Sequence, residues 1–337
     1  NFFSELLVLI LSVYYFKVTV SRDVKISLGS FSKGALFGIL SMTLWVIIHQ
    51  IGDTGLYRID NILVNLFWST RESGILGALS EFGTYVMTVV AVIASLFGPL
   101  ILIAYSDDDH KSVIKLTSDN SLLVGLSSAL LVGLSIGFAK PIISLWLGEE
   151  YVLYKHWFIL KQVTLPFYAA AGVFAFVYRA WNKVIFPALA TLAIGLLNFG
   201  FSYFLCQISN GSEKFIFYML LVAVAFIIAQ SYGLNAFYFY KLYPEIGFRT
   251  PLTIFFKILL GLLLAVFLAT LYTYIASPGD IIQLIFGLLT VSAVFSLTGF
   301  TLFLNQRQKD FVNVYIKKGR IFLTHHFNGF INNNPGI

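Results

Sequence analysis

Long apolar runs, separated by short polar breaks, dominate the pattern of the chain. About nine apolar segments reach or approach the roughly 20 residues that a helix needs to cross a bilayer. They lie near residues 2–16, 35–67, 74–104, 120–139, 157–178, 184–206, 214–240, 252–276 and 281–304. These runs are too long and too evenly apolar for the alternating strands of a membrane barrel. The pattern therefore predicts an all-α membrane protein with about nine transmembrane helices.

The polar breaks between these segments are short. They lie at residues 107–111, 148–150, 182–183, 210–212 and 277–280. Because connections this short join antiparallel neighbours, alternate loops should lie on opposite sides of the membrane. The 120–139 segment also contains many Gly, Ser and Ala residues, which favour close packing between helices.

Composition supports the same class of protein. The chain has 337 residues, of which 58% are hydrophobic and only 11% are charged, whereas a soluble domain carries about 25% charged residues. This balance excludes a soluble enzyme and a nucleic-acid-binding domain. Its one cysteine, Cys206, excludes a disulfide framework and a thiolate metal site. No GxSxG, P-loop or HExxH motif is present, so we predict neither an enzyme nor a cofactor or metal site.

Basic residues are distributed unequally between the two sets of loops. One side, which includes the 17–33 loop and the C-terminal tail, carries 16 Lys and Arg residues, and the opposite side carries 5. The positive-inside rule therefore places the 17–33 loop and the C-terminus in the cytoplasm. Arg58 belongs to neither side, because it lies within a predicted span.

The second span carries a polar stripe. At about 100° per residue, its polar side chains fall on one face about 140° wide, with Arg58 at the edge of this face. The other members of the stripe are His49, Gln50, Asp53, Thr54, Tyr57, Asp60 and Asn61. A straight helix over 35–67 would be about 50 Å long, which exceeds the hydrocarbon core of about 30 Å. We expect Gly52 and Gly55 to bend it.

Charged residues inside a span are costly and indicate a functional site. The next helix returns with Glu81, which we expect at the depth of Asp60, with Arg58 close enough to bridge the two carboxylates. These residues could form the wall of a substrate cavity, an ion pair that only locks two helices, or a switch that responds to protons or cations. For Lys161, near the outer start of a later span, we favour extension to the lipid headgroups over lining of the cavity.

Several stretches resemble the polysaccharide flippases, the O-antigen-type translocases of lipid-linked oligosaccharides that act in lipopolysaccharide and cell-envelope synthesis. Residues 57–64 (YRIDNILV), followed by Gly74, resemble the start of the second lobe of these proteins. Residues 143–151 (ISLWLGEEY) resemble an outer loop of that lobe, and residues 179–183 (RAWNK) resemble the next cytoplasmic turn. The likeness covers roughly residues 35–240.

The resemblance implies a fold like that of the multidrug-efflux (MATE) transporters, in which two six-helix lobes enclose a cavity. Residues 1–16 would then end the first lobe, and residues 17–34 would form a cytoplasmic linker. Residues 35–241 would form the second lobe, 252–304 two additional helices, and 305–337 a basic cytoplasmic tail. Most of a first lobe would precede residue 1, since the sequence begins without Met.

The resemblance also implies a function in the cell (inner) membrane. The substrate would be an oligosaccharide on a polyprenyl pyrophosphate, passed to the outer leaflet by alternating access. Arg58 would bind the pyrophosphate. The residues that would bind the sugar or line its path are His49, Gln50, Asp53, Tyr57, Asp60, Asn61 and Glu81. An ion-coupled drug or metabolite exporter remains an alternative, in which Asp53, Asp60 and Glu81 would bind Na⁺ or protons. A membrane-embedded glycan polymerase or ligase is a further alternative.

The tail after Asn305 mixes aromatic and aliphatic residues with Lys317, Lys318 and Arg320. Such a mixture favours a position along the membrane surface, so the tail should resist protease in vesicles that expose their cytoplasmic side. Mass spectrometry of the digest gives the cleavage sites. Rapid cleavage throughout 306–337 would indicate a solvated tail instead.

Overall fold

The computed structural model describes residues 2–16, 18, 32–306 and 308–310. Most of the expected linker over 17–34, and all of the expected tail after residue 310, lie outside these residues. The described part consists of helices and loops, without strands, so the prediction of an all-α membrane protein is confirmed. The chain divides into two units, residues 1–44 and residues 45–337. The first contains α1 (Phe2–Tyr15) and the beginning of α2 (Lys33–Tyr57).

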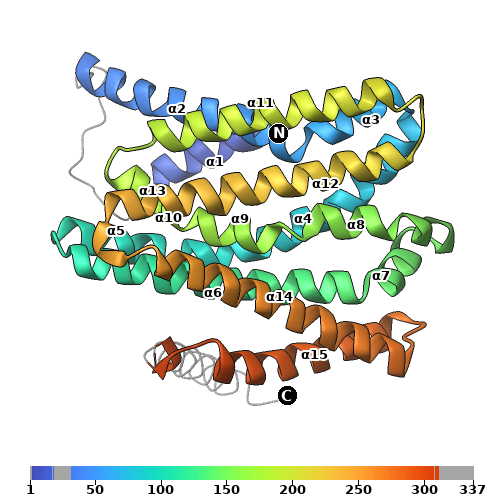
Figure 1. Ribbon diagram of the computed structural model, residues 1–337. Coiled ribbons are helices and arrows are strands. Elements are labelled where there is room, and N and C mark those ends of the chain that lie inside the picture. Colours follow the sequence, from blue (N-terminus) through green and yellow to red (C-terminus); the bar gives the residue numbers. More distant parts are fainter. Residues whose placement is uncertain (1, 17, 19–31, 307, 311–337) are drawn as a thin grey trace. The chain divides into compact units, whose positions relative to one another are not determined.

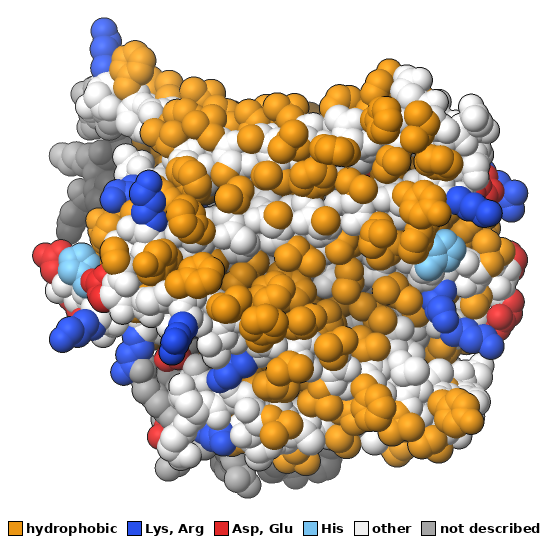
Figure 2. Space-filling view, viewed as in Figure 1, with side chains coloured by type: hydrophobic (Ala, Val, Ile, Leu, Met, Phe, Trp, Pro, Cys, Tyr) orange, Lys and Arg blue, Asp and Glu red, His pale blue; other side chains and the backbone are white. Residues whose placement is uncertain are grey.

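Eight helical segments in the described residues are long and apolar enough to cross a membrane. They are Leu36–Tyr57, Thr70–Ser106, His110–Gly137, Glu149–Ala180, Ile185–Ile208, Lys214–Leu242, Arg249–Ala276 and Ile281–Leu302. Each corresponds to one apolar segment of the sequence, and the first predicted segment is the shorter helix Phe3–Tyr15. In the second unit these helices run side by side (Figure 1). Charged side chains gather toward the helix ends, and apolar side chains cover the space between them (Figure 2).

Several predicted spans are not single continuous helices. The second predicted segment consists of nearly all of α2 together with α3 (Ile59–Phe67), and the third of α4 (Thr70–Ser95) and α5 (Gly98–Ser106), whereas the next is the single helix α6 (His110–Gly137). After α7 (Ala139–Trp146) and the 3₁₀ helix η3 (Glu149–Tyr154), one span divides into α8 (Lys155–Gln162), α9 (Leu165–Gly172) and α10 (Phe174–Ala180). Pro166 lies in the first turn of α9, where proline is tolerated because its missing N–H has no helical partner.

The remaining spans complete the second unit. These are α11 (Ile185–Ile208), α12 (Lys214–Ile228), which continues through the π-helical turn η4 (Ala229–Leu234) into α13 (Asn235–Leu242), and, after η5 (Pro244–Ile246), α14 (Arg249–Ala276) and α15 (Ile281–Leu302). Three of the five predicted polar breaks lie wholly between helices, and the other two, 107–111 and 148–150, overlap the beginnings of α6 and η3. In the first of them, Asp109 caps α6 by accepting a hydrogen bond from the backbone N–H of Ser112 (3.0 Å). Hydrogen bonding from Ser112 lowers the pKa of Asp109, which lies outside the spans.

Small residues bring two pairs of helices into close contact. Along α6, a Cβ added to Gly133 or Gly137 would collide with Ala265 or Ala269 of α14, which confirms the close packing predicted for the 120–139 segment. The end of α2 packs in the same way on α11, because a Cβ at Gly195 would collide with the backbone of Gly52. The prediction that Gly52 and Gly55 bend α2 is wrong. Both lie within one continuous helix that ends at Tyr57, and both contact α11.

Two polar side chains form hydrogen bonds between neighbouring helices. The Asn198 side chain of α11 donates from Nδ2 to the carbonyl oxygen of Gly55 (2.9 Å). Gln230 of η4 donates from Nε2 to the hydroxyl of Thr191 on α11 (2.6 Å). Hydrogen bonds of this kind stabilise helix association where water is absent. Together with the glycines, they fix α2 and η4 against α11.

Substitution of Gly195 tests the contact between α2 and α11. We expect Gly195→Ala to destabilise the protein by about 1–3 kcal/mol, because the added methyl forces two backbones apart. Gly200→Ala in the same helix is the matched control, because a Cβ there meets nothing within 4 Å. Thermal unfolding in detergent compares the two variants. Equal unfolding temperatures would contradict the close contact.

Candidate functional site

A break between two helices lies within the polar stripe, at the end of the span Leu36–Tyr57. The α2 helix ends at Tyr57 and α3 begins at Ile59, with Arg58 between them at φ −125° and ψ −14°. No side-chain cap satisfies the start of α3 at Arg58. The backbone N–H of Asn61 instead donates to Oδ1 of Asp60 (2.9 Å). Non-helical backbone at membrane depth is tolerated where it is buried in protein or lines a water-filled cavity, so the break itself suggests a site.

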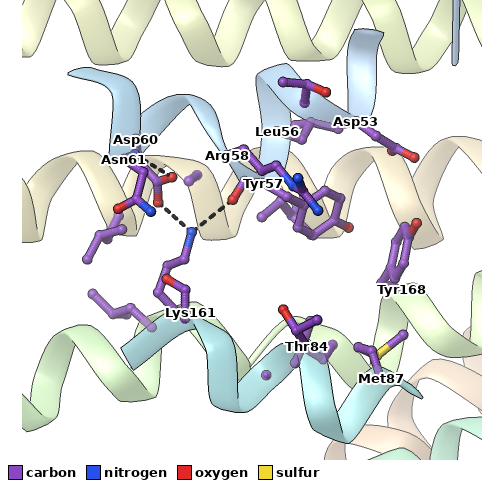
Figure 3. Close-up of a pocket in the computed structure, with 18 of the residues that line it drawn as sticks. Asp53, Leu56, Tyr57, Arg58, Asp60, Asn61, Thr84, Met87, Lys161 and Tyr168 are labelled. Carbon is purple, nitrogen blue, oxygen red and sulfur yellow. Dashed lines mark hydrogen bonds and ion pairs between the residues drawn. The ribbon is translucent and has the colours of Figure 1, made fainter. Parts of the chain in front are cut away.

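Lys161 of α8 reaches both sides of this break. Its Nζ donates to Oδ2 of Asp60 (2.7 Å) and to the carbonyl oxygen of Tyr57 (2.9 Å), as Figure 3 shows. The Lys161 side chain is 13% exposed and that of Asp60 is 3% exposed. The expectation that Lys161 extends to the headgroups is therefore wrong. A buried ammonium requires an anionic partner, and Asp60 supplies it from a helix 101 residues away in sequence.

Arg58 does not make the bridge expected of it. Within the described residues, its side chain forms no ion pair with Asp60 or Glu81, and both Arg58 and Glu81 are exposed. The reason is positional: the break turns Arg58 away from Asp60, which lies on the following helix and faces α8. Among the described residues, two cations therefore border the same space, Lys161 with an anionic partner and Arg58 without an ion pair.

This space is a cavity of about 960 Å³. Its walls come from the end of α2, α3, α4, the α8–α9 region and α12. Seven of the eight residues that the sequence predicted for the site line it, all except His49. The charged and polar lining residues are Gln50, Asp53, Thr54, Tyr57, Arg58, Asp60, Asn61, Ser80, Glu81, Thr84, Lys161 and Tyr168. Figure 3 shows several of them pointing toward one another from opposite helices.

His49 lies in a second, smaller cavity of about 310 Å³. Its Nε2 is 3.5 Å from Oδ2 of Asp53, one helical turn along α2. Asp53, Gln50 and Tyr168 line both cavities, so His49 is connected to the larger cavity through its neighbour. The rings of Tyr168 and Tyr57 meet edge to face, with their centroids 4.8 Å apart.

Three polar atoms in the cavity wall have no hydrogen-bond partner in the described structure. They are Tyr57 Oη, Asn61 Oδ1 and Asp53 Oδ1. A buried polar atom left without a partner costs about 1–3 kcal/mol. This cost indicates that water or a bound polar molecule normally completes the wall. The arrangement suits a ligand with both anionic groups and hydroxyls, because it offers cations, carboxylates, amides and phenols together.

Sequence reasoning misses several polar lining residues, among them Lys161 and Tyr168. It assigns Lys161 to the headgroups in preference to the cavity, and it does not single out Tyr168. A signal for Lys161 is present in the sequence: Asp60 is a carboxylate inside a span, and such a charge requires a nearby cation. No group of three or more His, Cys, Asp and Glu side chains that could hold a metal ion occurs among the described residues.

Comparison with known proteins adds one relative. The chain is 27% identical over 161 residues to the uncharacterized membrane protein EpsK of Bacillus subtilis (strain 168). The matched region makes up 46% of this chain and 30% of EpsK, so the chain spans less than a third of its relative's length. No protein-family model matches the chain, and no solved structure matches it. The eight apolar helices and the similarity to a membrane protein indicate the same class of protein. The chain is a multi-pass membrane protein.

Removal of the Tyr57 hydroxyl tests whether this group stabilises the fold or is available to a molecule in the cavity. Because Tyr57 Oη has no partner in the described structure, we expect Tyr57→Phe to leave stability unchanged or slightly higher. Tyr178→Phe is the matched control, because the Tyr178 hydroxyl donates to the Asn235 carbonyl (2.6 Å) and its loss should cost about 1 kcal/mol or more. Thermal unfolding measures both. A larger loss for Tyr57→Phe would indicate a structural role.

Proposed function

We propose that this chain is part of a polysaccharide flippase. In this proposal it moves an oligosaccharide linked to a polyprenyl pyrophosphate from the cytoplasmic to the outer leaflet of the cell membrane. One observation carries most of the proposal: a polar cavity of about 960 Å³ with two cations lies among membrane-spanning helices. The sequence resemblance to the O-antigen-type translocases also supports the proposal. The motifs that carry this resemblance include residues 57–64.

The chemistry of the cavity wall fits both parts of this substrate. A pyrophosphate needs cations that donate hydrogen bonds, and the unpaired Arg58 is free to do so. Sugar hydroxyls need donors and acceptors in a wet space, which Gln50, Asp53 and Asn61 provide. The polyprenyl tail would stay among membrane lipids, which are the other partners that we expect. The proposal requires no cofactor and no nucleic acid.

The proposed mechanism is alternating access of a cavity between two helical lobes. In this arrangement residues 35–241 form the second lobe, a further lobe lies in the longer protein that we expect to contain this chain, and the C-terminus is cytoplasmic. The helix break at Arg58 supports such a mechanism, because transporters commonly bind substrate at discontinuous helices near the middle of the membrane. We class the protein as a transporter and not as an enzyme.

An ion-coupled exporter of drugs or metabolites is the second candidate. Asp53 and Glu81 favour it, because both are carboxylates of the cavity wall, and among the described residues Glu81 has no ion pair and Asp53 has only His49. Na⁺ or protons would then bind at these carboxylates. The same ions could also drive a flippase, so the two candidates differ in cargo.

Replacement of Arg58 tests the proposed function. In a strain that lacks its own flippase, we expect the longer protein to restore surface polysaccharide and Arg58→Ala to abolish export, because the pyrophosphate loses its unpaired cation. Arg71→Ala is the matched control: Arg71 is an exposed arginine at the start of α4 that does not line the cavity. Immunoblotting of membranes checks insertion.

Unchanged export by Arg58→Ala would overturn the role in pyrophosphate binding. Failure of the wild-type protein to restore polysaccharide, with drug or cation efflux in the same vesicles, would favour the exporter. Glycan polymerisation or ligation by the purified protein would instead identify an enzyme.

A further inference from the structure

Lys161 has a feature that the proposed function does not use. Its ammonium carries three N–H donors, and the structure accounts for two of them, at Asp60 Oδ2 and at the Tyr57 carbonyl. The side chain also lines the cavity and retains 13% exposure. The third donor is therefore available to a molecule in the cavity, at the break where Arg58 also lies.

We propose that Lys161 is a phosphate-binding residue of this cavity and that Asp60 is its resident counter-ion. The proposal rests on the proposed function and names a second cation for the phosphate group of the substrate. Lys161 binds the anion through its free N–H, beside the guanidinium of Arg58. Asp60 holds the ammonium at the break and, through its negative charge, lowers the affinity of the empty cavity for anions.

The local geometry explains why a lysine stands at this position. The ammonium lies near the end of α8, where this helix gives way to α9, and it faces the break between α2 and α3. A lysine without a counter-ion would be costly at membrane depth. Asp60 supplies the opposite charge and fixes the direction of the Lys161 side chain. An arriving phosphate therefore meets an ordered cation, which lowers the cost of binding.

The proposed roles of Lys161 and Asp60 also predict that one substitution tightens anion binding. A purely structural ion pair does not predict this effect. In Asp60→Asn, an amide oxygen can still accept from Lys161 at the same place, but the negative charge near the anion is gone. Binding of a phosphate group should then become tighter. If the pair only locks α3 to α8, Asp60→Asn should lower stability and leave anion affinity unchanged.

The experiment measures binding of farnesyl pyrophosphate to the longer protein in phosphatidylcholine nanodiscs, with farnesol as the uncharged control. We expect Asp60→Asn to tighten binding about threefold or more and Lys161→Met to weaken it about tenfold or more, since a hydrogen bond to a charged group is lost. The double variant should bind more weakly than the wild type but more tightly than Lys161→Met, because the negative charge of Asp60 is also gone, and Lys161→Arg should bind nearly as the wild type does. Lys161→Met should also reduce the dependence of binding on salt.

The double variant is the control for destabilisation of the fold. Lys161→Met alone leaves Asp60 buried without a partner and is expected to destabilise the protein, whereas the double variant removes both charges. Unchanged affinity in the double variant, or unchanged or weaker binding in Asp60→Asn, overturns the proposal. If Arg58→Ala abolishes binding and the Lys161 variants do not alter it, this inference fails and the proposed function stands. If the wild type binds farnesol as tightly as farnesyl pyrophosphate, both fail.

A second arm identifies the source of the phosphate. Nanodiscs that contain phosphatidylglycerol offer a lipid headgroup with the same chemistry. If this lipid competes with farnesyl pyrophosphate in the wild type but not in Lys161→Met, phosphate binding at Lys161 is supported and headgroups share the site. If it does not compete, the site is selective for the pyrophosphate.

Discussion

A charged ammonium at membrane depth needs an anionic partner. In this protein the contacts of the ammonium also stabilise a break between two helices. Lys161 Nζ contacts Asp60 on α3 and the Tyr57 carbonyl at the end of α2. Backbone that leaves the helical pattern must be satisfied by protein or water in a membrane. Lys161 therefore stabilises the break at Arg58, and Asp60, which lies just beyond the break, supplies the opposite charge. The cavity lies at this contact, since α2, α3 and α8, which the contact joins, supply part of its walls.

The opposite face of α2 supplies the rigidity that this arrangement requires. Gly52 and Gly55 bring the backbone of α2 against Gly195 of α11, and Asn198 adds a hydrogen bond to the Gly55 carbonyl. In a membrane, where lipid tails are as apolar as leucine side chains, close backbone packing and hydrogen bonds drive helix association. One face of α2 is thus fixed by small residues, which leaves its polar face free to line a cavity.

The sequence is sufficient to predict the spans, because a long apolar run between polar breaks has few other structures available to it. It also places seven residues of the cavity wall, since one helical face collects side chains at regular spacing. It is not sufficient to locate the break or to choose between Arg58 and Lys161 as the partner of Asp60. A helical projection assumes an unbroken helix, and the partner of Asp60 lies 101 residues away. The prediction for Gly52 is wrong for a related reason, because a glycine that packs against a neighbour and one that bends its own helix look alike in sequence.

The charges of the cavity wall are not evenly distributed, and this gives the cavity a direction. Arg58 lies at the break and Lys161 reaches it, whereas Asp53 lies on α2, five residues before Arg58. Asp60 is neutralised by Lys161, and His49 lies beside Asp53. An anionic group would therefore be favoured at the break and repelled near Asp53, where hydroxyls that donate to a carboxylate are favoured instead. A molecule with a phosphate at one end and sugars at the other would be oriented by this separation alone, before either group made a specific contact. The same separation would draw a positively charged cargo toward Asp53 instead.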